Sequence, residues 1–330
     1  MTDDCFLITG ALGCIGAWVV HGLVKEKTRV VVFDLGSDPA RLRLLIDDEA
    51  LSQVTFVKGD ITQLSQLEET LDAHPITRVI HLAGLQIPFC RANPALGAQV
   101  NVVGTVNIFE AAKRRKDRIQ KVVYASSIGV FGQSEDYPEG GALSDDAPLV
   151  PHTLYGVYKQ ANEGTAHVYW LENGVSSVGL RPYVVYGVGR DQGLTSAPTL
   201  AMLAAAVGRP YHIGYGGRQT FQHAGDVARA FVQAARSSYQ GCGAFNLGGY
   251  APHMSGIVAT IGQVEPRAIG QVTFENKDLP YPPNIDGSGL DEAIGKVVYR
   301  SLLDGVSETI SAFRKLVDCG KMDPDILLKK

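Results

Sequence analysis

The chain has 330 residues, of which 45% are hydrophobic and 19% are charged. This length and composition are typical of one large globular domain, or of one domain with an attached lobe. The formal net charge is −4, with acidic and basic residues interspersed, which excludes the basic face of a nucleic-acid-binding protein. No apolar run approaches the roughly 18 residues that span a bilayer, and the first residues do not resemble a secretory leader. We therefore expect a cytoplasmic protein with no membrane partner.

The five cysteines are scattered along the chain and form neither a Cys-x-x-Cys pair nor a zinc-binding spacing. An odd and scattered set is typical of reduced thiols in a cytoplasm. We therefore expect no metal site.

The first half of the chain alternates between strand and helix patterns. Short runs rich in β-branched residues predict strands at 5–9, 29–33, 54–57, 78–82 and 121–125. Helical spacing of apolar residues predicts helices at 14–25, 64–71 and 95–115. Continuous apolar strands that alternate with helices favour an α/β protein with a doubly wound parallel sheet, the Rossmann plan.

The second half continues this pattern and then loses it. Helices are predicted at 153–171, 226–235 and 306–316, and strands at 177–180 and 244–247. Gly, Pro and Tyr interrupt the pattern between 183 and 217, and the segments beyond 251 are short and Pro-rich. We predict an NAD-binding Rossmann domain from residues 1–182 plus 218–250, and a smaller C-terminal substrate-binding lobe from 183–217 plus 251–330.

A glycine-rich loop lies between the first strand and the first helix. Its glycines are Gly10, Gly13 and Gly16, and Cys14 and Ile15 stand at the start of the helix. Glycine here permits a tight turn and lets backbone N–H groups approach a pyrophosphate at the helix N-terminus. The loop therefore predicts a dinucleotide cofactor, with the Cys14 thiol packing beside it rather than reacting.

Asp34 ends the second predicted strand. A carboxylate at this place accepts hydrogen bonds from the ribose hydroxyls of NAD and repels the additional phosphate of NADP. No arginine follows it immediately. The sequence therefore predicts NAD as the cofactor.

Tyr155 and Lys159 are four residues apart in a predicted helix, which places them on one face. A phenol with a pKa of about 10 is a poor base at neutral pH, but a nearby ammonium group favours its ionised form. Tyr155 can then take a proton from a secondary alcohol while a hydride passes to NAD. Ser127, at the end of a predicted strand, can hold the substrate oxygen. Ser126 is the alternative, because neighbouring strand residues point to opposite sides.

Seven stretches of the chain resemble the extended short-chain dehydrogenase/reductases, and in particular the NAD-dependent epimerase/dehydratase family. They are GALGCIG (10–16), GDIT (59–62), HLAG (81–84), NVVGT (101–105), YASSIGVFG (124–132), YGVYK (155–159) and RPYVVYG (181–187). The resemblance is strong over residues 5–190 and weaker beyond them. It implies catalytic roles for Ser127, Tyr155 and Lys159, in an NAD-dependent enzyme that acts on a sugar-type small molecule.

The resemblance also implies where further residues lie around the cofactor. They are Asp60 and Ile61 at the adenine, Leu82 and Ala83 along the cofactor, Asn101 as a structural or cofactor-side residue, and Pro182 and Val185 at the nicotinamide. Family members often form homodimers through two helices that pair into a four-helix bundle. Here these helices would be those near 95–115 and 153–171, so a homodimer is expected.

Departures from the family pattern bear on the substrate. Ile128 and Gly129 stand where dehydratases carry an Asp-Glu pair, which disfavours a dehydratase. The arginine that grips the diphosphate in nucleotide-sugar epimerases falls on Gln219, with Arg218 one residue earlier. The usual Arg-Pro-Gly-Asp is also absent, and residues 279–283 stand in its region.

These departures favour a smaller polyol, sugar or sugar acid over a nucleotide sugar. The polar loop at 187–195 follows the catalytic half, and loops at strand ends suit the recognition of substrate hydroxyls. Arg190 and Thr195 of this loop, with Arg218, Ser127 and Tyr155, are the candidate substrate-binding residues.

Three functions remain open from the sequence. The sequence favours a sugar or nucleotide-sugar epimerase, which would return the hydride to the other face of the ketone and keep its cofactor bound. A dehydrogenase of a sugar, sugar acid or polyol would exchange its cofactor in each turnover. A non-catalytic NAD-binding scaffold is the third, although it would have no need of the intact Ser127, Tyr155 and Lys159.

Overall fold

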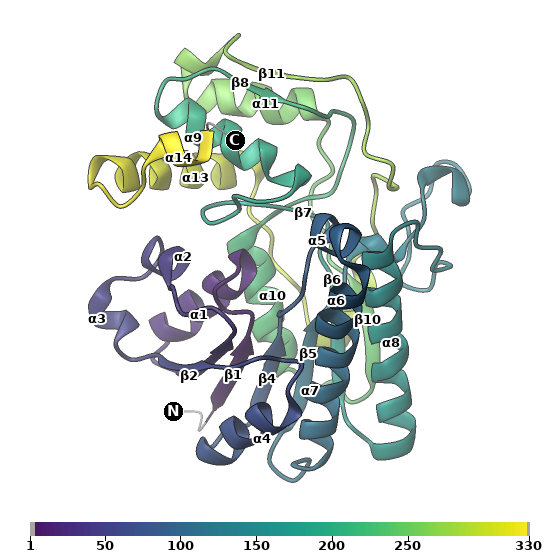
Figure 1. The fold of residues 1–330 in the computed structure, drawn as a ribbon. Coiled ribbons are helices and arrows are strands. Elements are labelled where there is room, and N and C mark those ends of the chain that lie inside the picture. The colour runs from purple at the N-terminus through teal and green to yellow at the C-terminus, as the bar shows by residue number, and fades with distance from the viewer. Residues whose placement is uncertain (1–3, 329–330) are drawn as a thin grey trace.

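A seven-stranded sheet forms the centre of the cofactor-binding half (Figure 1). The computed structural model describes residues 4–328. The strand order is β10-β6-β5-β4-β1-β2-β3, and every neighbouring pair is parallel. The strands are β1 (Cys5–Thr9), β2 (Arg29–Asp34), β3 (Thr55–Lys58), β4 (Arg78–His81), β5 (Lys121–Ala125), β6 (Ser177–Arg181) and β10 (Cys242–Asn246). The order reverses between β1 and β4, the place where such sheets bind dinucleotides.

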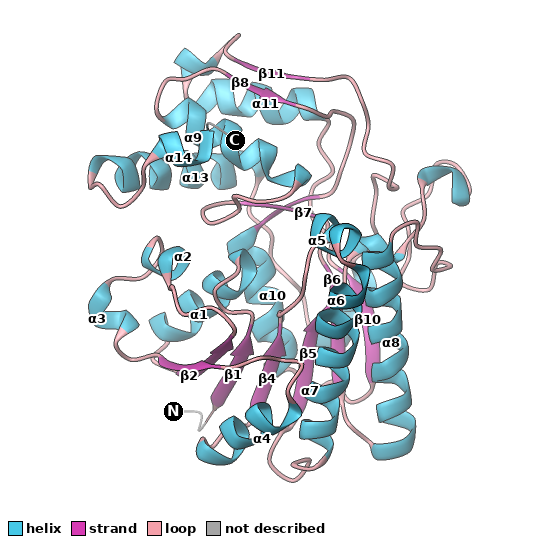
Figure 2. Cartoon of the chain, viewed as in Figure 1, coloured by secondary structure: helices cyan, strands magenta, loops and turns pink. Residues whose placement is uncertain are grey.

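Helices cover both faces of this sheet, as Figure 2 shows. One face packs against α1 (Cys14–Lys25) and α10 (Ala224–Arg236), and the other against α4 (Leu64–Ala73), α7 (Gly104–Lys113) and α8 (Leu154–Asn173). Alternate residues of β1 divide between the two cores, because side chains of a strand point to opposite sides in turn. Phe6 and Ile8 lie in one core, and Cys5 and Leu7 in the other. The predicted doubly wound Rossmann fold is confirmed.

The helix predicted at 95–115 is not a single regular helix. It consists of α6 (Pro94–Ala98), a π-helical turn (Gln99–Val103) and α7, so the prediction was wrong in its middle. The side-chain amide of Asn101 donates to Gly97 O at 3.0 Å and to Leu85 O at 3.2 Å. These bonds pull the backbone out of the regular α-helical ladder, and single π-turns of this kind occur often at functional sites.

The remaining elements form a lobe above the sheet and its connections (Figure 1). Lobe helices are α9 (Ala197–Ala206), α11 (Met254–Val264), α13 (Leu302–Asp318) and α14 (Pro324–Leu328), and β8 (Tyr211–Ile213) pairs in parallel with β11 (Val272–Phe274). A second small parallel pair, β7 (Val184–Tyr186) with β9 (Phe221–His223), joins the two halves. Short helices complete the chain: α2 (Ala40–Arg43), α3 (Asp48–Leu51), α5 (Ile87–Ala92), α12 (Ser288–Ile294) and five 3-10 or π turns.

The packing shows how the two halves share the chain. Val184, Met202 and Phe313 belong to the core of the lobe, as the predicted division expects. Leu290 and Val297, from the segment predicted for the lobe, belong instead to the core around α1 and α10. The division into 1–182 plus 218–250 and 183–217 plus 251–330 stays a prediction. Within residues 4–328 no helix is both long enough and apolar enough to cross a membrane.

Candidate active site

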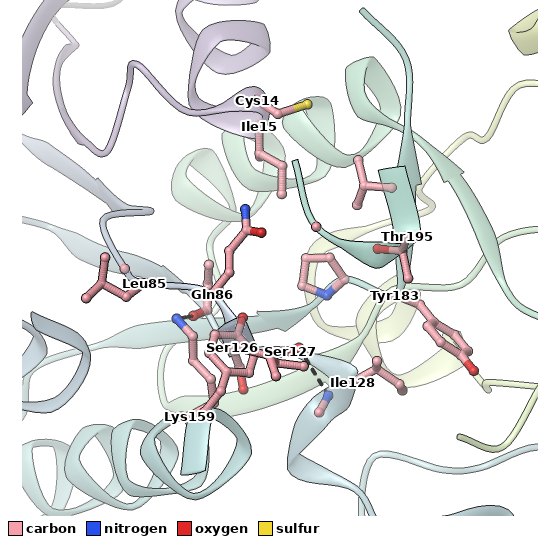
Figure 3. A pocket seen from close by; sticks show the side chains of 18 of the residues that line it. Cys14, Ile15, Leu85, Gln86, Ser126, Ser127, Ile128, Lys159, Tyr183 and Thr195 are labelled. Atoms are coloured by element: carbon pink, nitrogen blue, oxygen red, sulfur yellow. Dashed lines mark hydrogen bonds between the residues drawn. The ribbon is translucent and has the colours of Figure 1, made fainter. Parts of the chain in front are cut away.

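A cavity of about 710 Å³ opens between the carboxyl ends of the strands and the lobe. Figure 3 shows its side chains converging from the glycine loop, the strand ends, α8 and the lobe. Most of the residues predicted from the sequence line it: Gly10, Gly13, Cys14, Ile15, Gly16, Leu82, Ser127, Tyr155, Lys159, Pro182, Val185, Arg190 and Thr195. Residues far apart in the sequence therefore form one site.

The glycine loop forms a cradle that side chains would fill. Gly10 has φ +69°, and a Cβ there would lie 2.5 Å from Ala83 N. A Cβ on Gly16 would lie 2.4 Å from Gly10 O, so the first turn of α1 can approach β1 this closely only without a side chain. The loop therefore presents backbone N–H groups at a helix N-terminus, which fits the pyrophosphate of NAD.

Asp34 is tied to this loop at the end of β2. Its Oδ2 accepts a hydrogen bond from Leu12 N at 3.1 Å, and its Oδ1 accepts one from Gly36 N at 3.2 Å. The carboxylate is thus fixed beside the glycine loop, where NAD places its adenosine ribose in this fold.

Asp60, Ile61 and Ala83 lie outside the cavity lining but around the same loop and strand ends. Asp60 Oδ1 accepts from Thr62 N at 2.9 Å, which leaves this residue in a local turn after β3. Ile61 is buried against the helix start at Gly104. Ala83 lies against Gly10. Their direct contact with the cofactor stays a proposal.

Asn101 holds the loop that follows β4. Its Oδ1 accepts from Leu85 N at 3.2 Å, while its Nδ2 donates to Leu85 O. Both ends of its amide therefore bind protein. These bonds hold the Gly84–Gln86 segment in place, and Asn101 is not among the residues that line the cavity. Its contact with the cofactor stays a proposal.

Ser127 and Tyr155 meet because helix α8 begins very close to the turn after β5. Thr153 caps α8 by accepting from Gly156 N at 3.0 Å. A Cβ on Gly156 would lie 2.1 Å from Gly129 O, so only glycine lets the helix approach the turn this closely. Ser127 Oγ accepts from Gly129 N at 3.1 Å, and the Ser127 hydroxyl lies near enough to the Tyr155 phenol to lower the pKa of the phenol. The two predicted catalytic hydroxyl groups are adjacent.

Burial raises the pKa of the Tyr155 phenol above its ordinary value. The Ser127 hydroxyl and the positive charge of Arg190 act in the opposite direction and lower this pKa. Tyr155 is therefore protonated at neutral pH unless further positive charge enters the site.

Lys159 lies one turn further along α8 and beneath the phenol. Its Nζ donates to Ala125 O at 2.7 Å and lies 5.6 Å from the centre of the Tyr155 ring. Burial lowers the pKa of Lys159 to about 8. The ammonium group is thus held at a fixed place beside Tyr155 and is charged at neutral pH.

Ser126, the alternative to Ser127, is engaged elsewhere. Its Oγ donates to Glu163 Oε1 at 2.5 Å, and Glu163 forms a buried ion pair with Arg181 at 2.7 Å. Ser126 also lines the cavity, but its hydroxyl is held by this buried network, which leaves the hydroxyl of Ser127 for a role beside Tyr155. Sequence reasoning missed the network, although Glu163 stands four residues after Lys159 and so shares its helix face.

A further wall of the cavity is built mainly from the lobe. Arg190 Nη2 donates to Thr195 Oγ1 at 2.8 Å, which fixes the guanidinium group at the cavity wall. Tyr183 donates through its hydroxyl to Tyr281 O at 3.3 Å, and both tyrosines line the cavity together with Gln86. These last three residues were missed, because they follow no motif and come from three separate segments.

Arg218 lies apart from this site. It is exposed, its guanidinium group donates to Ala251 O at 3.2 Å, and it does not line the cavity. Its neighbour Gln219 is fully buried. We therefore leave Arg218 out of the proposed substrate site.

Cys14 lies beside the glycine loop and faces the cavity (Figure 3). Burial raises the pKa of its thiol to about 11, although Arg190 and Arg41 oppose the shift. The thiol stays protonated at neutral pH, in keeping with a packing role.

Comparisons with known proteins agree with this geometry. A UDP-glucose 4-epimerase from Mycolicibacterium smegmatis is 30% identical over 322 residues, which cover 93% of this chain and 98% of the relative. UDP-glucuronate 4-epimerase 2 from Arabidopsis thaliana is 34% identical over 185 residues, 55% of this chain. That match spans only 42% of the plant protein, less than half of its length.

A solved structure of an L-threonine dehydrogenase from Cupriavidus necator has the same fold. Its TM-score is 0.80 at 22% identity, and the match covers 93% of this chain and 99% of the other. The model of the NAD dependent epimerase/dehydratase family matches residues 6–248. This chain belongs to that family, and it is an NAD-dependent enzyme on a Rossmann fold.

Proposed function

We propose that this enzyme is an epimerase of a sugar-type substrate, in which Tyr155 is the base and NAD carries the hydride. The observation that supports this best is the meeting of Ser127, Tyr155 and Lys159 with the glycine loop in one cavity. The relatives that are UDP-sugar 4-epimerases support the same reaction class.

Each residue has a distinct task in the proposed mechanism. Ser127 and Tyr155 hold the reacting hydroxyl of the substrate, since their own hydroxyl groups are adjacent. The charge of Lys159 favours the ionised phenol, which takes the hydroxyl proton and later returns it. The glycine loop and Asp34 would hold NAD, which would supply the acceptor for a hydride from the substrate carbon and, in an epimerase, the source from which the hydride returns to the opposite face. Proton and hydride both return, so the reaction has no net redox change.

The substrate is proposed to lie between α5, the 187–195 loop and Tyr281. Arg190, Thr195 and Gln86 offer hydrogen bonds there, and Tyr183 offers an aromatic wall. The family position for a diphosphate-binding arginine holds the buried Gln219, and Arg218 is turned outward. This favours a sugar or sugar acid over a nucleotide sugar.

We also propose a cytoplasmic homodimer through the helices near 95–115 and 153–171. Apolar side chains of these helices are exposed in the single chain, among them Val103 at 44%, Val157 at 43% and Val168 at 46%. Exposed apolar patches of this kind are typical of protein interfaces.

A net dehydrogenase of a small alcohol is the second candidate. It is supported by the likeness to the fold of an L-threonine dehydrogenase. It is also supported by the buried Gln219, which stands where nucleotide-sugar epimerases have an arginine that binds the diphosphate. The same Tyr155 and Lys159 would serve, but reduced cofactor would leave in each turnover.

One experiment separates the two. Purified enzyme with excess NAD is given free sugars, sugar acids, polyols, L-threonine and nucleotide sugars, and each tube is followed by absorbance of reduced nicotinamide and by product analysis. An epimer formed without accumulating NADH is the expected result. Steady accumulation of NADH with one substrate would instead establish the dehydrogenase.

A further inference from the structure

An ion pair connects the adenosine side of the cofactor half to the substrate lobe. Arg41, on α2, donates through Nη2 to Asp191 Oδ1 at 2.8 Å and through Nε to the same oxygen at 3.3 Å. Its Nη1 donates to Leu12 O at 3.1 Å. One guanidinium group therefore binds the glycine loop and the lobe at the same time.

The lobe segment that carries Asp191 is fixed at a second point. Trp18, on α1, donates through its indole Nε1 to Val188 O at 2.9 Å. A Cβ on Gly189 would lie 3.8 Å from the Arg41 side chain, and this glycine has φ +87°. The 188–191 turn thus rests on α1 and α2, directly across the glycine loop.

The position of this turn matters because the turn also forms part of the cavity wall. Arg190, between Gly189 and Asp191, lines the cavity together with Gly13 and Cys14 of the glycine loop. Arg190, Arg41 and Asp191 all lie near enough to Cys14 of this loop for their charges to shift the pKa of its thiol. Each side chain of the Arg41–Asp191 pair is about a quarter exposed, at 26% and 25%, so solvent screens the pair only in part.

We propose that the Arg41–Asp191 pair retains the cofactor by closing the side of its site between the glycine loop and the lobe. A bound dinucleotide would then leave only after this pair opens and the 188–191 turn moves away. The inference rests on the proposed function, because an epimerase that keeps its hydride carrier needs slow cofactor release, whereas a dehydrogenase does not.

The test measures cofactor release rather than turnover. Enzyme loaded with NADH is mixed in a stopped-flow instrument with a large excess of NAD, and the loss of bound-NADH fluorescence gives the dissociation rate. The variants are Asp191→Asn, Arg41→Gln and the double variant. Asp38→Asn is the matched control in the same exposed segment. Asp38 forms a long contact of 4.0 Å with Arg43 and accepts from Ala40 N at 3.1 Å, a hydrogen bond that the amide oxygen of asparagine can also accept.

We expect each single variant to release NADH about tenfold faster, which corresponds to about 1.4 kcal/mol. The double variant should be no faster than Arg41→Gln alone, because that single variant has already lost the contact with Asp191, together with the hydrogen bond to Leu12 O. Asp38→Asn should match the wild type. High salt should speed release from the wild type and leave the double variant unchanged.

Two failures are distinguishable. Slow release in the wild type with unchanged rates in all variants would overturn the role of the pair and leave the epimerase proposal intact. Release in the wild type that is as fast as turnover would overturn the epimerase proposal, and with it the retention role. Circular dichroism of each variant shows that a faster rate does not come from unfolding.

Discussion

The cofactor half and the substrate lobe differ in what fixes their shape. In the cofactor half, backbone groups do much of the binding, and the places of Gly10, Gly16 and Gly156 are dictated by contacts shorter than 3.0 Å that a Cβ would make. In the lobe, the cavity is lined by side chains such as those of Arg190 and Tyr183. The backbone at these positions could carry many other side chains. Under the proposed function, the chemistry would therefore be fixed by one half and the choice of substrate by the other.

We expect the largest effect from removing the proposed base, Tyr155, which belongs to the cofactor half. Tyr155→Phe should lower kcat by about 10²–10⁴-fold, because the proton acceptor is lost, and should leave NADH affinity within twofold. Kinetics with the best substrate and a fluorescence titration with NADH measure the two effects. Tyr158→Phe is the control, since Tyr158 lies on the same helix and donates to Pro94 O at 2.9 Å, outside the cavity. Near-normal rates in Tyr155→Phe would remove Tyr155 from the mechanism.

A matched pair of glycines on α1 tests the backbone cradle. Gly16→Ala should weaken NAD binding and lower the free energy of unfolding by about 1–3 kcal/mol, because its Cβ would press on Gly10 O. Gly22→Ala meets nothing within 4 Å and should stabilise the protein by about 0.5–1 kcal/mol. Denaturant titration and calorimetric binding of NAD provide both numbers. Equal effects of the two substitutions would contradict a close approach at Gly16.

The charge of Lys159 gives a pH dependence with a defined sign. Its pKa is lowered to about 8, so the ammonium group is present below that pH and is lost above it. Because this charge favours the ionised Tyr155, the pH profile of kcat/KM should have an alkaline limb that bends downward at about pH 8, below the continued rise that the ionisation of Tyr155 alone would give.

Lys121 provides the control for this limb. Burial lowers its pKa to about 8 as well, but it binds Ser237 at the opposite end of β5. Lys121→Met should therefore leave the alkaline limb in place. If the alkaline limb disappears in Lys121→Met, the titrating group is Lys121 and not Lys159.

The smallest expected effect lies in the lobe. Thr195→Val removes the acceptor that fixes Arg190, a hydrogen bond of about 1 kcal/mol, and should raise KM about five- to tenfold. The affinity for NADH should stay unchanged. Thr273→Val, at an exposed position of strand β11, is the control in the same half, because the hydrogen bond between Thr273 and His212 lies outside the cavity. A change in NADH affinity without a change in KM would contradict the assignment of cofactor binding to one half and of substrate binding to the other.

Much of the cofactor half could be predicted from the sequence, because its pattern is physical. Strands β1 and β5 and helix α1 begin and end at the predicted residues. The π turn around Asn101 could not be predicted, since it arises from bonds between Asn101 and the distant Leu85. The spacing of apolar residues shows which face of a helix is buried, but it does not show contacts between distant residues.

The lobe was predicted poorly for a different reason. Helix α9 is apolar nearly all round and almost entirely buried, so it has no polar face to set a helical period. Only α13, with its clear apolar stripe, was predicted at 306–316. The cavity residues Gln86, Tyr183 and Tyr281 come together from separate segments, and spacing in one sequence carries no record of that meeting.

The shared packing of the two halves has a consequence for how the chain folds as it is synthesised. Strand β10 closes the edge of the sheet, and Leu290 and Val297 complete the core around α1 and α10. Chains emerge from the ribosome with their N-termini first, and domains generally fold as they become complete. Here the half that begins first cannot finish until most of the lobe has also emerged. A nascent chain stalled after β10 would therefore expose apolar surface beside α10, where chaperones would bind it.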